Sequence, residues 1–306
     1  MTDDKPLTSF APPPLSAALT VAGMVGSSLY FFPKIEHPDA TIFTNVVFPE
    51  ILSVKELIAI RLFFAFVCFV GFATAWLTPP VVVTTPYRPK SRAPRITFEL
   101  AGWKKHFPFT SWSWNLLGIS FALNAYIAYQ VDQQQDVPDW MVRMGLMLWE
   151  VAAPMTLLIG AVVKYALWPA QIKKSGRGEG FMTPRALLQH NANVIMAMAE
   201  VALLGGIPSH FSHAGLSVLY GCSYVLFAWS IQTTLHGQGP AFQYFFMDTT
   251  IGTEHTIALY VLLSVLMLFY GLFCTVDTLL HMVGNNFTAH ATFALTICSL
   301  VCRFRD

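Results

Sequence analysis

The sequence predicts an all-α protein, a polytopic bundle of transmembrane helices with about eight spans. Of its 306 residues, 55% are apolar and only 11% are charged, whereas a soluble domain carries about 25% charged residues. Apolar runs of the length that crosses a bilayer recur along the whole chain. Such a chain has too little polar surface to cover a soluble globule. The net charge of +1 gives no indication of a nucleic-acid partner.

Apolar segments of about 20 residues cross a bilayer as a helix, because each residue adds 1.5 Å. The sequence contains these candidates: residues 15–33, 52–78, 110–131, 141–168, 186–206, 213–235, 254–280 and 288–303. The first and last are short, so that a full crossing is least certain there. We expect a single membrane domain over residues 15–303. Residues 1–14 are expected to be a disordered cytoplasmic N-terminus. They lack the basic start of a cleaved signal peptide, so the first predicted span is expected to be an uncleaved anchor.

Lysine and arginine orient the predicted spans, because cytoplasmic loops are enriched in both. The proline-rich loop 79–109 is the most basic segment, and we expect an extended cytoplasmic linker there. Its basic residues are Arg88, Lys90, Arg92, Arg95, Lys104 and Lys105. The loop 169–185 and the tail after residue 302 are also basic, whereas 132–140 is acidic. Eight alternating spans put every basic segment on one side, which predicts that both termini are cytoplasmic.

Ionisable residues inside predicted spans are costly and mark functional or structural sites. They are Arg61, Glu150, Lys164, Glu200 and Asp277. Lys164 and Asp277 lie near span ends and can reach the interface. Arg61 lies deep and needs a partner. Glu150 and Glu200 are the obvious carboxylates, and the sequence does not choose between them.

Two polar stretches begin predicted spans on the cytoplasmic side. One is Gln189 to Asn193, which contains His190 and is followed by Glu200; the other is Thr110 to Asn115. Ten residues on a helix turn about 1000° and rise about 15 Å, so His190 and Glu200 cannot touch. Thr110 and His190, by contrast, begin parallel spans at similar depth. A hydroxyl and an imidazole at one level are what a nucleophile and its general base require.

The aromatic-rich segment from His106 to Thr110, and the spacing of ten residues from His190 to Glu200, resemble a known family. It is the androgen-induced-protein family of multipass membrane hydrolases, which includes the androgen-dependent regulator of tissue factor pathway inhibitor. The resemblance covers roughly residues 55–280. Further similar positions are Ala153-Pro154, Tyr165 to Trp168, Tyr224, Trp229, Gly237 or Gly239, and Phe242 to Phe245. The chain departs from the family pattern at His106, Lys164 and Leu187.

The resemblance implies a six-span core with an extra span at each end, and hydrolysis of lipid esters, with fatty acid esters of hydroxy fatty acids as the substrate class. Thr110 would be the nucleophile and His190 its base. Donors for the oxyanion are sought among Asn115, Asn191 and Asn193, and Glu200 is a candidate pocket residue. Whether Ser111 or Ser113 replaces Thr110 stays open. No cofactor or metal is expected, and membrane lipids are the expected partners, in the endoplasmic reticulum, another endomembrane or the plasma membrane.

Three alternatives remain. A non-catalytic receptor, carrier or structural membrane protein keeps the same spans without chemistry. A haem-binding electron carrier would use histidines that gather at span ends: His190, His236 and His255 on one side, and His210, His213, His281 and His290 on the other. A zinc hydrolase would use His210 and His213, although no acidic residue accompanies them in their loop.

Overall fold

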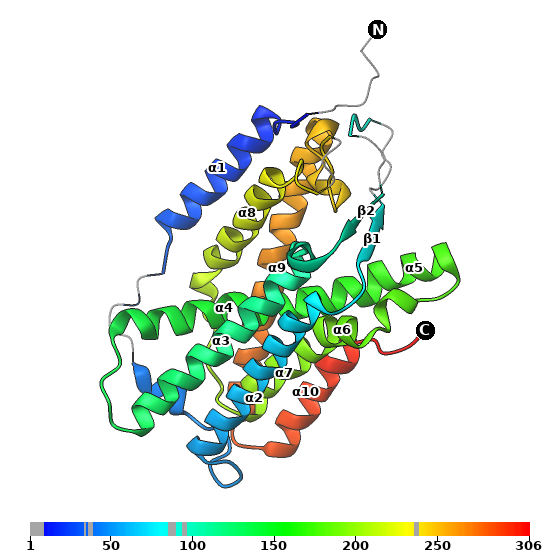
Figure 1. Cartoon of the computed structure of the whole chain (residues 1–306). Coiled ribbons are helices and arrows are strands. Elements are labelled where there is room, and N and C mark those ends of the chain that lie inside the picture. The colour runs from blue at the N-terminus through cyan, green and yellow to red at the C-terminus, as the bar shows by residue number, and fades with distance from the viewer. Residues whose placement is uncertain (1–8, 34, 36–38, 85–89, 94–96, 236–238) are drawn as a thin grey trace. The chain divides into compact units, whose positions relative to one another are not determined.

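A computed structural model describes residues 9–306 except 34, 36–38, 85–89, 94–96 and 236–238 (Figure 1). The described chain is mostly helical, which confirms the all-α prediction apart from one small sheet. It divides into two compact units that alternate along the sequence. The first comprises Met1–Phe32, Ala73–Phe109 and Gly215–Leu268, and the second comprises Pro33–Phe72, Thr110–Ala214 and Phe269–Asp306.

Within the described residues, four helical segments are long and apolar enough to cross a membrane. They are Val54–Trp76, Asp139–Ser175, Phe211–Ser230 and Thr253–Val283. Each coincides with a predicted span, so the prediction of several membrane helices is supported by length and composition. The prediction of eight spans is wrong.

The four other predicted spans fail for different reasons. Helices α1 (Leu15–Tyr30) and α10 (Phe287–Val301) have only 16 and 15 residues, or about 22–24 Å, against a hydrocarbon core of about 30 Å. Helix α3 (Phe109–Asp132) is long, but its serine, asparagine and glutamine residues lower its hydropathy. In the 186–206 segment the helix ends at Leu203, and the polar run from Gln189 to Asn193 lowers the hydropathy. Because the predicted orientation assumed eight crossings, the cytoplasmic termini stay a prediction.

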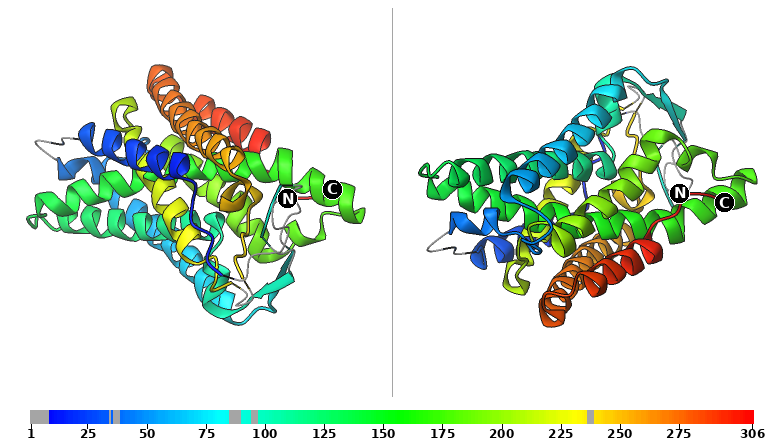
Figure 2. Two further views of the ribbon diagram at one scale, coloured as in Figure 1. Left: turned by 90° about the horizontal axis from the view of Figure 1, so that it is seen from above. Right: turned by 90° about the horizontal axis from the view of Figure 1, so that it is seen from below.

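The second unit contains the larger apolar core. Its helices are α2 (Val54–Ala73), α3, α4 (Asp139–Val162), α5 (Trp168–Ser175), α6 (Pro184–Leu187), α7 (Asn193–Leu203), α10 and the later half of α9 (Thr253–Val283). α2 and α3 pack closely, since a Cβ on Gly118 would lie 2.5 Å from the Cys68 Cβ. Trp114 Nε1 donates to the Cys68 carbonyl at 3.0 Å across the same contact. In both views of Figure 2, α10 turns back beside the end of α9.

The first unit holds α1 against α8 (Gly215–Ser230), where Gly215 leaves room for the backbone of Ser28. Strands β1 (Val81–Thr84) and β2 (Thr97–Leu100) pair antiparallel, with Val81 opposite Leu100. This hairpin lies inside the segment predicted to be an extended linker. Apolar residues explain the difference, because Phe98 and Leu100 are buried in a small core of their own. Arg88 and Arg95 of the predicted basic loop, and residues 1–8, lie outside the described residues.

Candidate functional site

His190 lies in a π turn, Leu188–Ala192, between α6 and α7. Its ring packs edge-on against Phe181, with 5.8 Å between ring centroids. Nδ1 is buried and makes no hydrogen bond of ordinary geometry in the described part of the chain. Burial lowers the pKa of His190 to about 4, and the Ala186 carbonyl offsets part of that effect. The imidazole is therefore neutral at pH 7.

Thr110 occupies the first turn of α3 and is half-buried. It does not hydrogen bond to His190 Nδ1, which makes no hydrogen bond of ordinary geometry among the described residues. The hydroxyl–imidazole pair that the sequence suggests is thus not formed through that nitrogen. Ser111 and Ser113, the alternative nucleophiles, are both buried in the same turn.

The three candidate oxyanion donors have different surroundings. The amide of Asn191 holds the backbone of Arg303 at two points: Nδ2 donates to the carbonyl at 2.6 Å and Oδ1 accepts from the N–H at 3.0 Å. Asn191 is therefore already engaged in holding the segment after α10. Asn193 is buried, and its Oδ1 accepts from the Val194 N–H at 2.8 Å, which leaves its amide nitrogen as a donor. Asn115 lines an apolar cavity.

That cavity lies between α2 and α3 and has a volume of about 450 Å³. Its wall is formed by Ala65, Phe66, Cys68, Phe69, Phe72, Asn115, Gly118, Ile119 and Ala122. Asn115 is the one polar side chain in that set. The space is suited to hydrocarbon, with a single amide at its edge.

Glu200 is the partner that Arg61 requires. Arg61 Nη2 lies 2.5 Å from Glu200 Oε1, and Nε lies 3.1 and 3.2 Å from the two carboxylate oxygens. Arg61 Nη1 also donates to the Phe43 carbonyl at 2.5 Å. Both charged side chains are fully buried. Glu200 is thus engaged in an ion pair, and it lines neither the cavity between α2 and α3 nor the one where α7 and α9 end.

Glu150 has a different environment, with an imidazole and a backbone amide at its carboxylate. His213 Nδ1 lies 2.7 Å from Oε2, and the His210 N–H donates to Oε1 at 3.0 Å. Tyr270 donates its hydroxyl to the His210 carbonyl at 2.9 Å. The acidic partner of this histidine loop lies 60 residues earlier in the chain. The local sequence around His210 and His213 could not reveal it.

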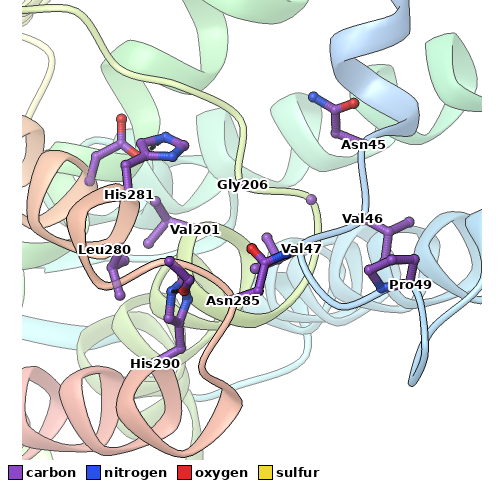
Figure 3. Close-up of a pocket in the computed structure, with 13 residues that line it drawn as sticks. Asn45, Val46, Val47, Pro49, Val201, Gly206, Leu280, His281, Asn285 and His290 are labelled. Atoms are coloured by element: carbon purple, nitrogen blue, oxygen red, sulfur yellow. Dashed lines mark hydrogen bonds and ion pairs between the residues drawn. The ribbon is translucent and has the colours of Figure 1, made fainter.

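A second cavity, of about 310 Å³, lies where α7 and α9 end (Figure 3). It is lined by Asn45, Val46, Val47, Pro49, Val201, Gly205, Gly206, Asp277, Leu280, His281, Gly284, Asn285 and His290. Asp277 Oδ2 accepts from the Ser209 N–H at 3.0 Å, and Oδ1 lies 3.6 Å from His281 Nε2. From the sequence, Asp277 was expected to reach the membrane interface, and no sequence signal indicated this cavity.

His290 is held at both ring nitrogens. Nδ1 lies 2.7 Å from the Ala202 carbonyl, and Nε2 lies 2.9 Å from the Gly284 carbonyl. The ring joins the end of α7 to the turn after α9.

The histidines proposed for haem or zinc are largely engaged elsewhere. His213 contacts Glu150, His290 contacts two carbonyls, and His255 lies 2.7 Å from the Phe246 carbonyl through Nδ1. His236 lies outside the described residues. No group of three His, Cys, Asp or Glu residues in the described ranges is arranged to hold a metal ion.

Comparisons of the chain with protein-family models, with curated proteins and with solved structures find no match.

Proposed function

We propose that the chain is a membrane-bound lipid-ester hydrolase of the androgen-induced-protein type, with Thr110 as nucleophile and His190 as general base. The observation that carries the proposal is the state of His190. Its ring is neutral and its Nδ1 has no hydrogen bond of ordinary geometry among the described residues. A general base must be deprotonated and have a free lone pair. It also lies in a π turn, a rare irregularity that occurs frequently at functional sites.

Helix α2 is bonded to both α3 and α7, the helices next to Thr110 and His190. The Trp114–Cys68 hydrogen bond fixes α3, which begins with Thr110, against α2. The Arg61–Glu200 pair fixes α7, which follows His190, against the same helix. Both elements are therefore held by α2, and the dyad requires Thr110 Oγ1 and a His190 ring nitrogen to reach hydrogen-bond distance in the substrate complex. Apo enzymes often hold catalytic pairs looser than hydrogen-bond distance.

The apolar cavity between α2 and α3 supports a substrate with a hydrocarbon chain. It has a volume of about 450 Å³, and Asn115 is its one polar lining residue. Asn115 lies five residues after Thr110 on α3. An acyl chain in this cavity would bring its ester end toward the first turns of α3.

The chemistry follows from these groups. Thr110 Oγ1 attacks the ester carbonyl carbon, and its proton passes to His190. The oxyanion receives a hydrogen bond from a nearby N–H, for which the Asn193 amide is the best available donor. The alcohol leaves with the proton from His190. Water, deprotonated by His190, then cleaves the threonine ester and releases the fatty acid.

The proposal is tested by labelling membranes that contain the protein with a fluorophosphonate probe and by measuring release of fatty acid from a hydroxy fatty acid ester. Thr110→Ala and His190→Ala should each lower both signals at least 100-fold, because nucleophile and base act as one unit. Thr296→Ala on α10 is the matched control and should leave both signals unchanged. Full activity in both site variants would favour the alternative of a non-catalytic receptor, carrier or structural protein. If Ser111→Ala or Ser113→Ala abolishes activity while Thr110→Ala retains it, that serine is the nucleophile and Thr110 is not.

The acid side of the pH profile provides a separate test. The pKa of His190 is about 4, and a base loses activity as the pH falls through its pKa. We therefore expect kcat/KM to stay level from pH 7 down to about 5 and to fall tenfold per pH unit below about 4. A decline centred near pH 6.5, the ordinary histidine value, would contradict the buried, neutral state assigned to this ring.

A further inference from the structure

We propose that the cavity at the ends of α7 and α9 binds a small organic ammonium group, either on a free amine or on a lipid headgroup. The site is separate from Thr110 and His190, and the inference does not depend on hydrolysis. Its components are one buried carboxylate, two helix C-terminal ends and an apolar wall, all around a volume of about 310 Å³ (Figure 3).

Asp277 provides the buried carboxylate. Its side chain is only 7% exposed, and one oxygen accepts from the Ser209 N–H. The other oxygen faces His281 Nε2 at 3.6 Å, which is beyond hydrogen-bond distance. A carboxylate has about four acceptor positions, so most of the acceptor capacity of Asp277 is unused. The hydroxyl of Ser209, which is also buried, has no partner among the described residues.

The helix ends add to this negative potential. Helix α7 ends at Leu203, and Gly205 and Gly206 follow on the cavity wall. Helix α9 ends at Val283, and Gly284 and Asn285 follow on the same wall. The C-terminus of a helix carries a partial negative charge of roughly half an electron and favours cations. Two such ends and one carboxylate therefore converge on one cavity.

No fixed cation offsets them in the described lining. The lining residues contain no lysine or arginine, and the buried Arg61 beside Gly205 is neutralised by Glu200. His290 directs both nitrogens to backbone carbonyls, so its ring serves the helix ends and not Asp277. Glu150 and His210 both act electrostatically on Asp277 from behind the wall, with opposite effects, and Glu150 is itself paired with His213. His281 also faces Asp277, and its side chain is 68% exposed.

The remaining wall selects the shape of the ligand. Val46, Val47, Pro49, Val201 and Leu280 form an apolar side, and Asn45 and Asn285 supply amides. A hydrated inorganic ion gains little from an apolar wall. An ammonium group on a short carbon chain pairs with Asp277 and buries its methylene groups at the same time.

The experiment uses the full-length protein in lipid nanodiscs and measures its thermal unfolding. Free ligands are ethanolamine and tetramethylammonium, with propanol and potassium chloride as the neutral and inorganic counterparts. Lipid ligands are compared by replacing phosphatidylglycerol nanodiscs with phosphatidylethanolamine or phosphatidylcholine nanodiscs. We expect a saturable rise in Tm with the ammonium compounds and no rise with propanol or potassium. A rise with the zwitterionic lipids alone identifies the source as a headgroup.

Two variants connect that response to the cavity. In Asp277→Asn the amide oxygen still accepts from the Ser209 N–H, so the fold is retained, but affinity for the amine should fall at least tenfold. Val47→Phe fills the space and leaves Asp277 in place, and it should abolish the response. Asp132→Asn, at the end of α3, is the control with unchanged affinity. The proposal is wrong if Asp277→Asn binds the amine as tightly as the native chain, if propanol acts like ethanolamine, or if both cavity variants still respond.

Discussion

The buried Arg61–Glu200 pair illustrates how two buried charges can compensate each other within the fold. Both side chains are fully buried and joined by several hydrogen bonds, with the Phe43 carbonyl taking one more N–H of the guanidinium. Once its partner is removed, a buried charge is left without compensation, which typically costs 3–5 kcal/mol.

We therefore expect Glu200→Gln and Arg61→Met each to destabilise the protein by about 3–5 kcal/mol in unfolding measurements in detergent. The double variant Arg61→Met with Glu200→Met should recover most of that loss, because no unpaired charge remains. Lys90→Ala is the control, since Lys90 and Glu254 form an ion pair with side chains 72% and 49% exposed. Exposed pairs contribute about 0–1 kcal/mol. Equal losses at the buried and exposed pairs would contradict this account.

Gly205 is required by the same pair. A Cβ at this position would lie 1.9 Å from Arg61 Nη2 and 2.5 Å from Glu200 Oε1. Gly205→Ala should consequently displace the guanidinium and lower the Tm by as much as Glu200→Gln does. Gly23→Ala in α1 is the matched control, because a Cβ there meets nothing within 4 Å. Replacing a glycine inside a helix by alanine stabilises the folded protein by about 0.5–1 kcal/mol. A harmless Gly205→Ala would show that the pair adjusts more freely than its burial suggests.

At the scale of elements, the segment after α10 is attached beside His190. Asn191 holds Arg303, Asp306 accepts from Trp168 Nε1 at 2.8 Å, and the indole of Trp168 stacks on Phe181. Phe181 in turn contacts His190. The surroundings of the imidazole thus depend on residues more than 100 positions later in the chain.

We expect Asn191→Ala to release this segment, because it removes both hydrogen bonds to Arg303. Hydrogen exchange of residues 302–306 should become at least tenfold faster, which corresponds to about 1.4 kcal/mol, a typical total for two such bonds. Gln171→Ala, which loses only a bond to the exposed Ser175, is the control. Unchanged protection in Asn191→Ala would assign the attachment to Asp306 instead.

The elements also show what the sequence could and could not predict. Continuous apolar runs identified the four long helices, since burial and lipid both favour such runs. The broken helix around His190 was missed because a π turn leaves no clear mark on hydropathy. The β hairpin was missed because proline and basic residues dominated the composition around two short strands.

The candidate site residues, too, were only partly predictable from the sequence. The need of Arg61 for a partner follows from its sequence position, but that partner lies 139 residues away. Glu150 and His213 are similarly separated by 63 residues, and Asp277 reaches its cavity only through the fold. A single sequence shows which buried charges need a partner. It does not show which distant residue is that partner.

At the scale of the whole molecule, the number of crossings is the main point to test. Cysteine residues introduced singly at positions in 132–138, 176–183 and 79–84 can be labelled from each side of sealed vesicles. The sequence predicts that 79–84 and 176–183 share the cytoplasmic side and that 132–138 is opposite. That result requires α3 to cross despite its polar residues. If 79–84 and 132–138 label from the same side, α3 does not cross and the predicted orientation of the later loops is wrong.

The π turn at Leu188–Ala192 has a consequence for how the chain tolerates insertions and deletions. A π turn contains one residue more than the α-helix that it interrupts. Deletion of one residue there would restore a continuous α-helix with both flanking segments in their present register, so that Glu200 stays opposite Arg61. The same deletion inside α7 would move Glu200 away from Arg61. Length changes are thus tolerated by the fold at the π turn, although they alter the direction of the His190 ring.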